Sequence, residues 1–532
     1  MADSNQQSRV TEVAPSSSNS SSSEPQARKG IRFWIILGSL VLGTFLCVLE
    51  SYATSTALPT IVRDLHSGEF VWVASAYALS TLMLQSQMFG RRQVILGSLA
   101  VFIVGSALSG AAQSMNMLIA GRAVHGAGAG GITTLSQIIL SDLVTLRERG
   151  TYNGLFGLTW AIGGGIGPII GGSLAHHTIW RWIFYLNVPA GAVIALLLLF
   201  FLRLRKPPAV KRTFREVLGR VDLLGNLLLI GASCACAIAL TWGGVQFAWQ
   251  SPSVLVPLCL GVAGFCVWAL YEWRFCSYPV VPAHLLLNRT SFSGSVSRHY
   301  LPVYYQACKD ASPAASGIDL FGLCFSTGPM AIITGISVGK SKVYRVQLWV
   351  GWCLILVGVG LMNIITEDSN RSLSIGFQVV TGIGIGILYS AAYFPVLAPL
   401  PITSTAFALS FYVFLRSFAQ IWGVTIGGAL LQNELQRRLP LTVQNAIPGL
   451  NNVAYAVIPL IPTMAQPEKD LTRKAFAESL AIIWRMLTAV AGVGLIASFF
   501  MKGLPLHTQR DENWAVAVES ERDVDDAEKP DA

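Results

Sequence analysis

The sequence predicts an all-α polytopic membrane protein, and its composition carries most of that prediction. Apolar residues make up 53% of the 532 residues and charged residues only 12%, about half the charged share of soluble domains. The chain holds 50 glycines, and glycine is more frequent in membrane helices than in soluble ones. This composition excludes a soluble enzyme, a nucleic-acid-binding protein and a secreted scaffold, whose surfaces need more polar residues.

Thirteen apolar stretches are long enough to cross a bilayer, because a helical span needs about 20 residues. In chain order they are 33–53, 70–89, 94–113, 116–140, 154–175, 183–202, 222–244, 253–273, 316–338, 346–366, 373–397, 404–430 and 481–501. The polar segments around them are a serine-rich tail (1–32), a basic linker (203–221), a long loop (431–480) and an acidic tail (502–532).

The basic residues predict the orientation, because lysine and arginine close to the spans stay in the cytoplasm. If the N-terminus lies inside, the inside loops hold the pair Arg91 and Arg92, the pair Arg147 and Arg149, and the basic linker. The loops between them carry few basic residues. Both termini are therefore expected in the cytoplasm, and topology accounts for most of the net charge of +9.

A fourteenth crossing, defective or re-entrant, is needed to keep the basic residues at 340–345 inside. The only candidate is the stretch 291–306, which is too short for a full span and contains Arg298. Its terminal Tyr304 and Tyr305 would suit a segment at the membrane interface.

Three ionisable residues lie within predicted spans, where charge is costly and usually functional. Glu50, near the outer end of the first stretch, could load and release protons as a buried carboxyl group, or could face water at the interface. Arg122 lies deep in the fourth stretch, where carbonyl groups could also hold it for packing alone. Arg416 could line a cavity or pair with another helix.

Glycine clusters mark the fourth and fifth stretches. In the fifth stretch the cluster lies at 163–172 and includes a proline. Small residues let helix backbones approach each other, and a proline permits a bend. Static packing is the alternative explanation. The residues concerned are Gly163, Gly167, Pro168, Gly171 and Gly172. The nine cysteines form no metal or disulfide pattern, and no cofactor is expected.

Several of these motifs resemble signatures of the major facilitator superfamily. They are Leu49-Glu50 with Ala57-Leu58-Pro59, Phe89-Gly90-Arg91-Arg92, Gly121-Arg122 with Gly126-Ala127-Gly128, the run 163–172, and Trp180 to Pro189. The combination resembles the fungal fourteen-span drug:proton antiporter group over about 33–505. That resemblance implies two six-helix bundles (33–202 and 274–501) on either side of two inserted spans (222–273).

The resemblance also implies roles for the candidate residues. Glu50 would carry a proton or bind a cationic substrate, and Arg122 would assist proton transfer. His125 stands where relatives commonly have glutamine. Gly90, Arg91 and Arg92 would form a cytoplasmic gating loop, and the glycines and proline of the fifth stretch would shape a bend that favours antiport.

Two places depart from the family pattern. The chain looks about six residues shorter near 81–89, and it lacks most of a span near 291–301. Both places coincide with weak hydropathy. A shortened gene model or isoform is the expectation that follows.

The predicted function is proton-driven export of a small amphipathic or cationic compound, such as a drug, toxin or secondary metabolite, by alternating access. Protons would be the coupling ion, and the protein is expected to be a monomer in the plasma membrane that binds no nucleic acid. Trp160, Tyr389, Tyr393 and Tyr412 could line its cavity. A nutrient importer and a non-transporting sensor stay open as alternatives. A membrane enzyme is disfavoured, because the predicted spans contain no catalytic cluster.

Overall fold

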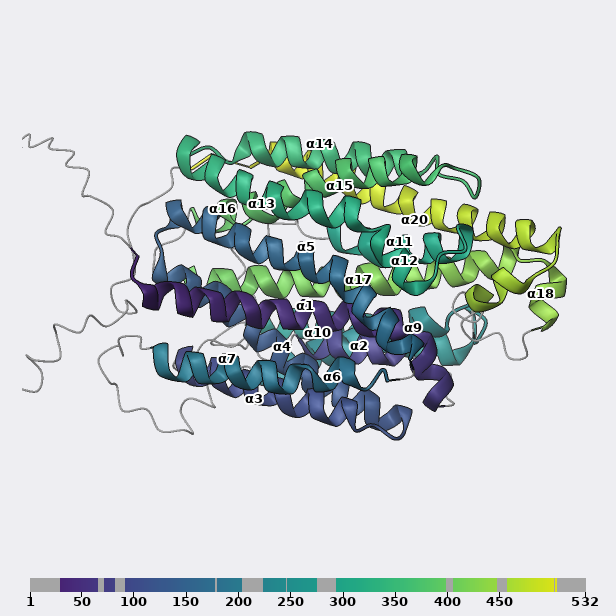
Figure 1. Ribbon diagram of the computed structural model, residues 1–532, viewed down its shortest axis with the longest axis horizontal. Helices are drawn as coiled ribbons and strands as arrows, with labels where there is room; N and C mark the ends of the chain where they lie inside the picture. Colours follow the sequence, from purple (N-terminus) through teal and green to yellow (C-terminus); the bar gives the residue numbers. More distant parts are fainter. Residues whose placement is uncertain are drawn as a thin grey trace, which may run out of the picture.

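The computed structural model describes residues 29–65, 71–81, 91–177, 179–202, 223–244, 246–274, 293–398, 405–446, 457–501 and 503–504. Across these ranges the chain is helical, and its one β-type pairing is an isolated bridge between Gly243 and Phe247. The long helices run side by side along one direction (Figure 1). Eleven of the described helical segments are long and apolar enough to cross a membrane, which confirms the predicted fold class.

The described residues of the first part of the chain form long helices and a few short ones. They are α1 (Ile31–Leu65), α2 (Val71–Ser80), α3 (Arg91–Gly110), α4 (Met115–Leu143), α5 (Leu146–His176), α6 (Trp182–Tyr185), α7 (Asn187–Phe201), α9 (Leu223–Trp242) and α10 (Pro252–Arg274). The predicted linker 203–221 and most of both predicted tails lie outside the described residues.

The second part repeats this pattern of long helices with short helical turns between them. Its elements are α11 (Ser293–Cys308), α12 (Pro313–Ile318), α13 (Phe321–Ser341), α14 (Arg345–Met362), α15 (Arg371–Ala391), α16 (Phe394–Leu397), α17 (Thr405–Arg438), α18 (Leu441–Ala446), the 3-10 helix η3 (Ile458–Thr463) and α20 (Glu468–Phe499).

Two of the thirteen predicted stretches are not among the eleven apolar helices. The fourth stretch forms α4, which has 29 residues but is less apolar because Arg122, His125 and several glycines interrupt it. The second stretch is represented by the 10 residues of α2. Residues 82–90, where the chain looks shortened, lie outside the described residues.

The described part of the short stretch 291–306 is helical, as α11. Its last part, in α11, buries Tyr304 and Tyr305 almost completely. Hydrogen bonds make this burial possible, because the Tyr305 hydroxyl lies 2.7 Å from Ser374 Oγ and the Tyr304 hydroxyl donates to the Thr366 carbonyl at 3.0 Å. Both tyrosines therefore pack against other helices and connections of the protein.

The segment 431–480, predicted as a long loop, is partly helical. Helix α17 continues to Arg438 and α20 begins at Glu468. Arg438 pairs with Glu434 at 3.0 Å, one turn earlier, and with Glu478 at 2.7 Å. Such i,i+4 pairs and acidic residues in a first turn stabilise helices in water, so both helices extend beyond their apolar stretches.

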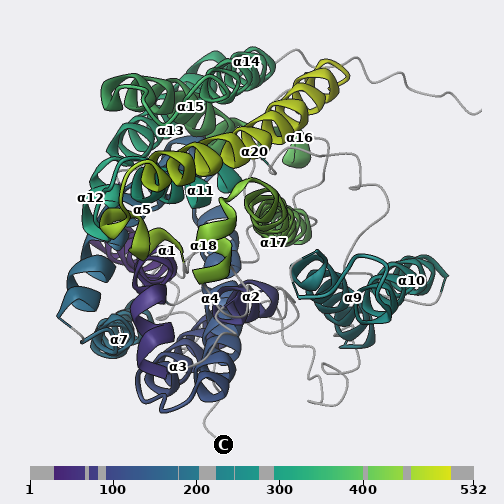
Figure 2. The same cartoon turned by 90° about the vertical axis from the view of Figure 1, so that its right-hand side faces the viewer.

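The two halves of the chain lie against each other, and α9 and α10 lie at one side (Figure 2). Helix α10 exposes most of its apolar side chains, as expected of a helix that faces lipid. It packs on α9 and reaches the rest of the protein through α17, where the Phe265 and Phe418 rings lie 6.0 Å apart. Asn433 of α17 also donates to the Gly243 carbonyl at 3.1 Å.

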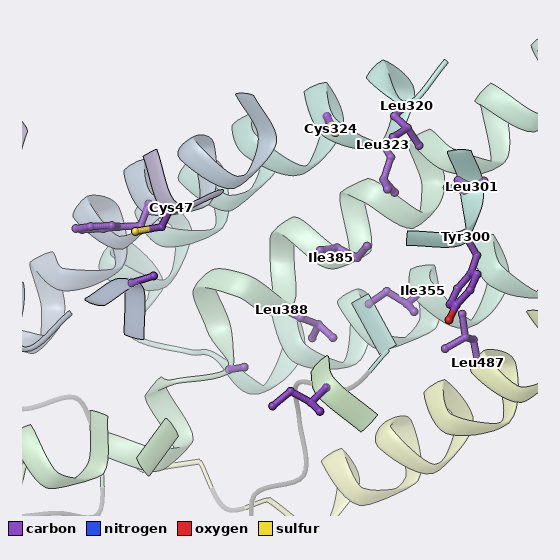
Figure 3. Close-up of a cluster of buried hydrophobic side chains, with 14 of the residues drawn as sticks. Cys47, Tyr300, Leu301, Leu320, Leu323, Cys324, Ile355, Ile385, Leu388 and Leu487 are labelled. Carbon is purple, nitrogen blue, oxygen red and sulfur yellow. The ribbon is translucent and has the colours of Figure 1, made fainter. Parts of the chain in front are cut away.

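One continuous apolar core joins residues of both halves, and Figure 3 shows part of it. The two halves meet most closely where α5 packs against α13. A methyl group at Gly328 would lie 3.0 Å from Ala161 Cβ, and one at Gly157 would lie 2.7 Å from Ala331 Cβ. These small residues let the two helix backbones lie in direct contact along their length.

Replacing Gly335 by alanine should destabilise the protein. The new methyl group would press against the Gly150 carbonyl and lie 3.0 Å from Thr151 N, and overpacking of this kind costs about 1–3 kcal/mol. The midpoint of thermal unfolding in detergent measures the effect. Gly360→Ala is the matched control, because nothing lies within 4 Å of that position. Equal midpoints for the two variants would contradict the close packing of α5 on α13.

Candidate functional site

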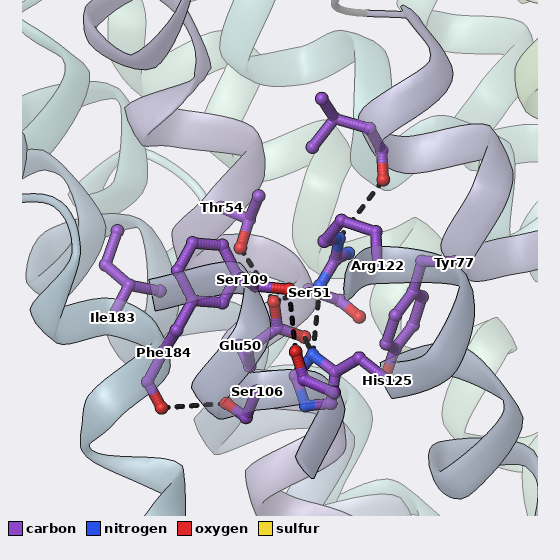
Figure 4. A network of polar contacts seen from close by, with 12 residues as sticks. Glu50, Ser51, Thr54, Tyr77, Ser106, Ser109, Arg122, His125, Ile183 and Phe184 are labelled. Carbon is purple, nitrogen blue, oxygen red and sulfur yellow. Dashed lines mark hydrogen bonds and ion pairs between the residues drawn. The ribbon is translucent and has the colours of Figure 1, made fainter. Parts of the chain in front are cut away.

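A buried polar cluster lies inside the first half of the protein, with Glu50 at its centre (Figure 4). Glu50 is 1% exposed. It lies within α1, which continues to Leu65, beyond the end of the apolar stretch. The interfacial alternative, a glutamate that faces water, is therefore excluded.

Arg122 of α4 is the main partner of Glu50. Its Nη1 donates to Glu50 Oε1, and its Nε donates to the Val73 carbonyl of α2 at 3.1 Å. The guanidinium also lies over the Tyr77 ring, 4.1 Å from the centroid. Thr54 donates to the same carboxylate oxygen at 2.8 Å. The cluster therefore joins α1, α2 and α4 through one carboxylate and one guanidinium.

His125, one turn after Arg122 on α4, completes the cluster. Its Nδ1 lies 3.4 Å from Arg122 Nη1 and 3.8 Å from Glu50 Oε2. Since a guanidinium can only donate, a bond between them makes Nδ1 the acceptor and leaves the ring proton on Nε2. The second carboxylate oxygen, Glu50 Oε2, and His125 Nε2 are both buried without a hydrogen-bond partner. Glu50 Oε2 can therefore accept a proton without breaking another hydrogen bond.

Glycines of α4 set the depth of this cluster. A side chain at Gly126 would lie 2.8 Å from Tyr77 Cα of α2, and one at Gly121 would lie 2.9 Å from Ser109 N of α3. Because these positions lack a Cβ, α4 can lie against both neighbours and carry Arg122 inward. The glycines predicted as packing residues thus position the charged pair.

A second group of charged side chains gathers where α4 joins α5, at the end predicted to be cytoplasmic. Arg91 Nε of α3 donates to Asp142 Oδ2 of α4 at 2.8 Å, and both side chains are buried. Arg92 donates to the Leu199 carbonyl of α7, and Arg149 Nη2 donates to the Ser141 carbonyl at 2.9 Å. The two predicted gating arginines therefore hold α3 against α4 and α7, whereas Gly90 lies outside the described residues.

The predicted bend residues of α5 face two different neighbours. Methyl groups at Gly163 and Gly167 would lie 2.9 Å from Val48 Cγ1 and 2.8 Å from Tyr52 Cβ, and Gly171 lies against the α1 backbone in the same way. A methyl group at Gly172 would lie 3.0 Å from Ala314 N. Helix α5 continues through Pro168, which lies beside Gly317. The run therefore lies between α1 of the first half and α12 of the second.

Arg416, which the sequence grouped with Glu50 and Arg122, lies apart from that pair. It extends from α17 between Trp160 of α5 and Tyr389 of α15. Of the other aromatic candidates, Tyr393 is buried and stacks on Phe394, with 4.4 Å between the ring centroids. The structure thus brings two of the four aromatic candidates to Arg416.

Sequence analysis missed two partners in these groups. Thr54 lies one helical turn after Glu50, and this i,i+4 spacing was a usable signal. Asp142 lies two residues beyond the fourth stretch and a few residues before Arg147 and Arg149. Its pairing with Arg91, 51 positions away, depends on how the helices pack and could not be found from spacing.

The comparisons with known proteins agree with this architecture. The family model described as Major Facilitator Superfamily matches residues 40–273. Efflux pump FUS6 of Gibberella fujikuroi is 35% identical over 533 residues, which cover 95% of this chain and 96% of that protein. The MFS-type efflux pump LUC4 of a Fusarium species is 36% identical over 93% of this chain and 92% of its own length.

A solved structure shows the same fold at much lower identity. The crystal structure of the human organic anion transporter MFSD10 (TETRAN) superposes with a TM-score of 0.55 over 88% of this chain and 100% of that chain, at 13% identity. The protein described here belongs to the Major Facilitator Superfamily. It is a multi-pass membrane transporter and not an enzyme.

Removing one partner of the Arg91–Asp142 pair should destabilise the protein more than removing both. A single Arg91→Met or Asp142→Asn change leaves the other charge buried, at a cost of about 3–5 kcal/mol. The double variant should cost less than the sum of the singles. Chemical unfolding in detergent measures the free energies, with Arg437→Met as the control because the Arg437 side chain is 74% exposed. Additive single effects would show that the two groups are not coupled.

Proposed function

We propose that this transporter exports small amphipathic compounds in exchange for protons, and that Glu50 carries the proton. The observation that supports the proposal is the buried pair of Glu50 and Arg122, since ionisable groups inside membrane helices are costly and mark ion pathways. The direction rests on the relatives, of which two of the most similar are efflux pumps by name.

Protonation of Glu50 would change the forces within the cluster. The neutral carboxyl group loses its charge attraction to Arg122, whose guanidinium keeps its contacts with the Val73 carbonyl, the Tyr77 ring and His125 Nδ1. A buried guanidinium without a counter-charge is unfavourable by several kcal/mol. The protonated cluster therefore favours a different arrangement of α1, α2 and α4. His125 Nδ1 gives Arg122 an alternative acceptor in that arrangement.

Alternating access would follow if this rearrangement tilts one half of the protein against the other. The close α5–α13 contact offers a hinge line between the halves, because its glycines leave few side chains to interlock. The pair of Arg91 and Asp142 would hold the cytoplasmic end of the first half together. In this scheme the proton enters from outside, and its release inside resets the transporter for the next compound.

The proposal also places the protein in the plasma membrane as a monomer, with both termini in the cytoplasm. The alternation of basic residues along the loops supports this orientation. A monomer suffices, because the proton group and the aromatic side chains around Arg416 all belong to one chain.

Glu50→Gln should abolish proton-driven export while leaving the protein folded. Glutamine keeps the size and one acceptor oxygen for Arg122 but cannot carry a proton. The test expresses each variant in a pump-deficient yeast strain, loads the cells with a panel of amphipathic drugs and fungal metabolites, and measures efflux under an imposed inward proton gradient. Glu50→Gln should export no faster with the proton gradient than without it.

Glu367→Gln is the matched control, because this glutamate lies in the polar connection between α14 and α15 and takes no part in the cluster. It should export like the unmodified protein. Unchanged gradient-dependent export by Glu50→Gln would remove Glu50 from the mechanism. Export by all variants that ignores the gradient would contradict proton coupling itself.

A further inference from the structure

Arg416 lies deep inside the membrane region, where the two halves of the protein meet. The apolar segment of its helix begins at Ala408, eight residues before Arg416. Trp160 and Tyr389 each lie at least eight residues from either end of their own apolar segments. Eight residues of helix correspond to a rise of about 12 Å. The guanidinium carbon lies 5.3 Å from the centre of the Trp160 ring and 5.4 Å from that of Tyr389. One helix of the first half and two of the second therefore surround one cation.

Arg416 differs from Arg91 and Arg122 because no acidic side chain among the described residues balances its charge. Arg91 pairs with Asp142, and Arg122 pairs with Glu50. Arg416 contacts the two aromatic rings, and among the described residues it has neither an ion pair nor a hydrogen bond. Aromatic rings offset only part of the cost of a charge in such a place. The site is therefore incomplete without a negative partner.

The polar atoms beside Arg416 point to the same partner. Trp160 Nε1 and the Tyr389 hydroxyl are both buried without a hydrogen-bond partner. The indole N–H and the guanidinium can only donate, and the tyrosine hydroxyl can donate as well. A ligand that satisfies all three must present acceptor oxygens. An anion also supplies the missing charge, whereas a cationic ligand would add to it.

The backbone holds this set of donors in place. Gly157 lies one turn before Trp160 on α5, and a methyl group there would lie 3.0 Å from the Tyr389 ring. The missing side chain lets Tyr389 approach α5 across the boundary between the halves. The guanidinium lies over both rings, and aromatic ring faces can also stack against a flat ligand.

We infer that Arg416, Trp160 and Tyr389 form an anion-recognition site, and that the exported compounds carry a carboxylate or a similar acidic group on an aromatic or conjugated body. The inference rests on the proposed function, because it names the compound class that the exporter takes. It replaces the cationic substrate suggested by the sequence with an acidic one. A ligand bound there contacts both halves of the protein, so its arrival and departure can favour different arrangements of the halves.

Binding of three probes of equal size and different charge tests the site. They are naphthoate, which is anionic, naphthamide, which is neutral, and naphthylmethylammonium, which is cationic. The measurement is the rise in unfolding temperature of the purified full chain as each probe is added, since at a given concentration a ligand that binds the folded state more tightly stabilises it more. Naphthoate should stabilise the protein at the lowest concentration.

Substitutions at the site should change the affinity for the anion selectively. Arg416→Gln should raise the Kd for naphthoate about tenfold to a hundredfold, the range expected for a lost charge-assisted hydrogen bond, and should leave the weaker binding of naphthamide unchanged. Arg416→Lys should recover part of the affinity because it keeps the charge without the planar fork. Trp160→Phe should weaken naphthoate binding less than Arg416→Gln. Arg437→Gln is the control, because Arg437 is exposed and remote from the site.

Three outcomes would overturn the inference. They are stabilisation by the cation or the amide equal to that by naphthoate, naphthoate binding that survives Arg416→Gln, and absence of naphthoate binding to the unmodified protein. None of them involves flux or protons, so they are distinct from a failure of the proposed export mechanism. Unfolding midpoints measured without probe show whether each variant is folded.

Discussion

The buried ion pair of Glu50 and Arg122 is the constraint on which the first half of this protein depends. Neither group can lie inside a membrane helix alone at an acceptable free energy, so α1 and α4 must keep a fixed distance and register. The Val73 carbonyl and the Tyr77 ring extend that constraint to α2. In the proposed mechanism, a proton on the carboxylate loosens all three helices at once.

Glycine is the second requirement, because charged groups can lie deep only where backbones lie close. The glycines of α4 bring Arg122 to Glu50, and those of α5 bring the two halves together along α13. The same absence of side chains beside Gly157 lets Tyr389 reach the neighbourhood of Trp160 and Arg416. The charged cluster and the aromatic site therefore depend on one packing principle, applied within a half and between the halves.

The sequence predicted the class of fold and most of the long helices, because apolar runs of membrane length have few other structures available to them. It also singled out Glu50 and Arg122, whose charge is conspicuous in such runs. It did not show that the two residues touch, since their spacing along the chain says nothing about how α1 and α4 pack. The burial of Tyr304 and Tyr305 was missed for a similar reason, because their hydrogen-bond partners lie on other helices.

The most direct test of proton coupling at Glu50 is a flux measurement in sealed liposomes that contain the purified transporter and an entrapped pH-sensitive dye. A gradient of an exported compound is imposed in the absence of any initial pH difference. The account predicts that compound movement in one direction drives protons in the other, and that Glu50→Gln carries the compound down its gradient without moving protons. Proton movement of equal size in both proteins would contradict the account.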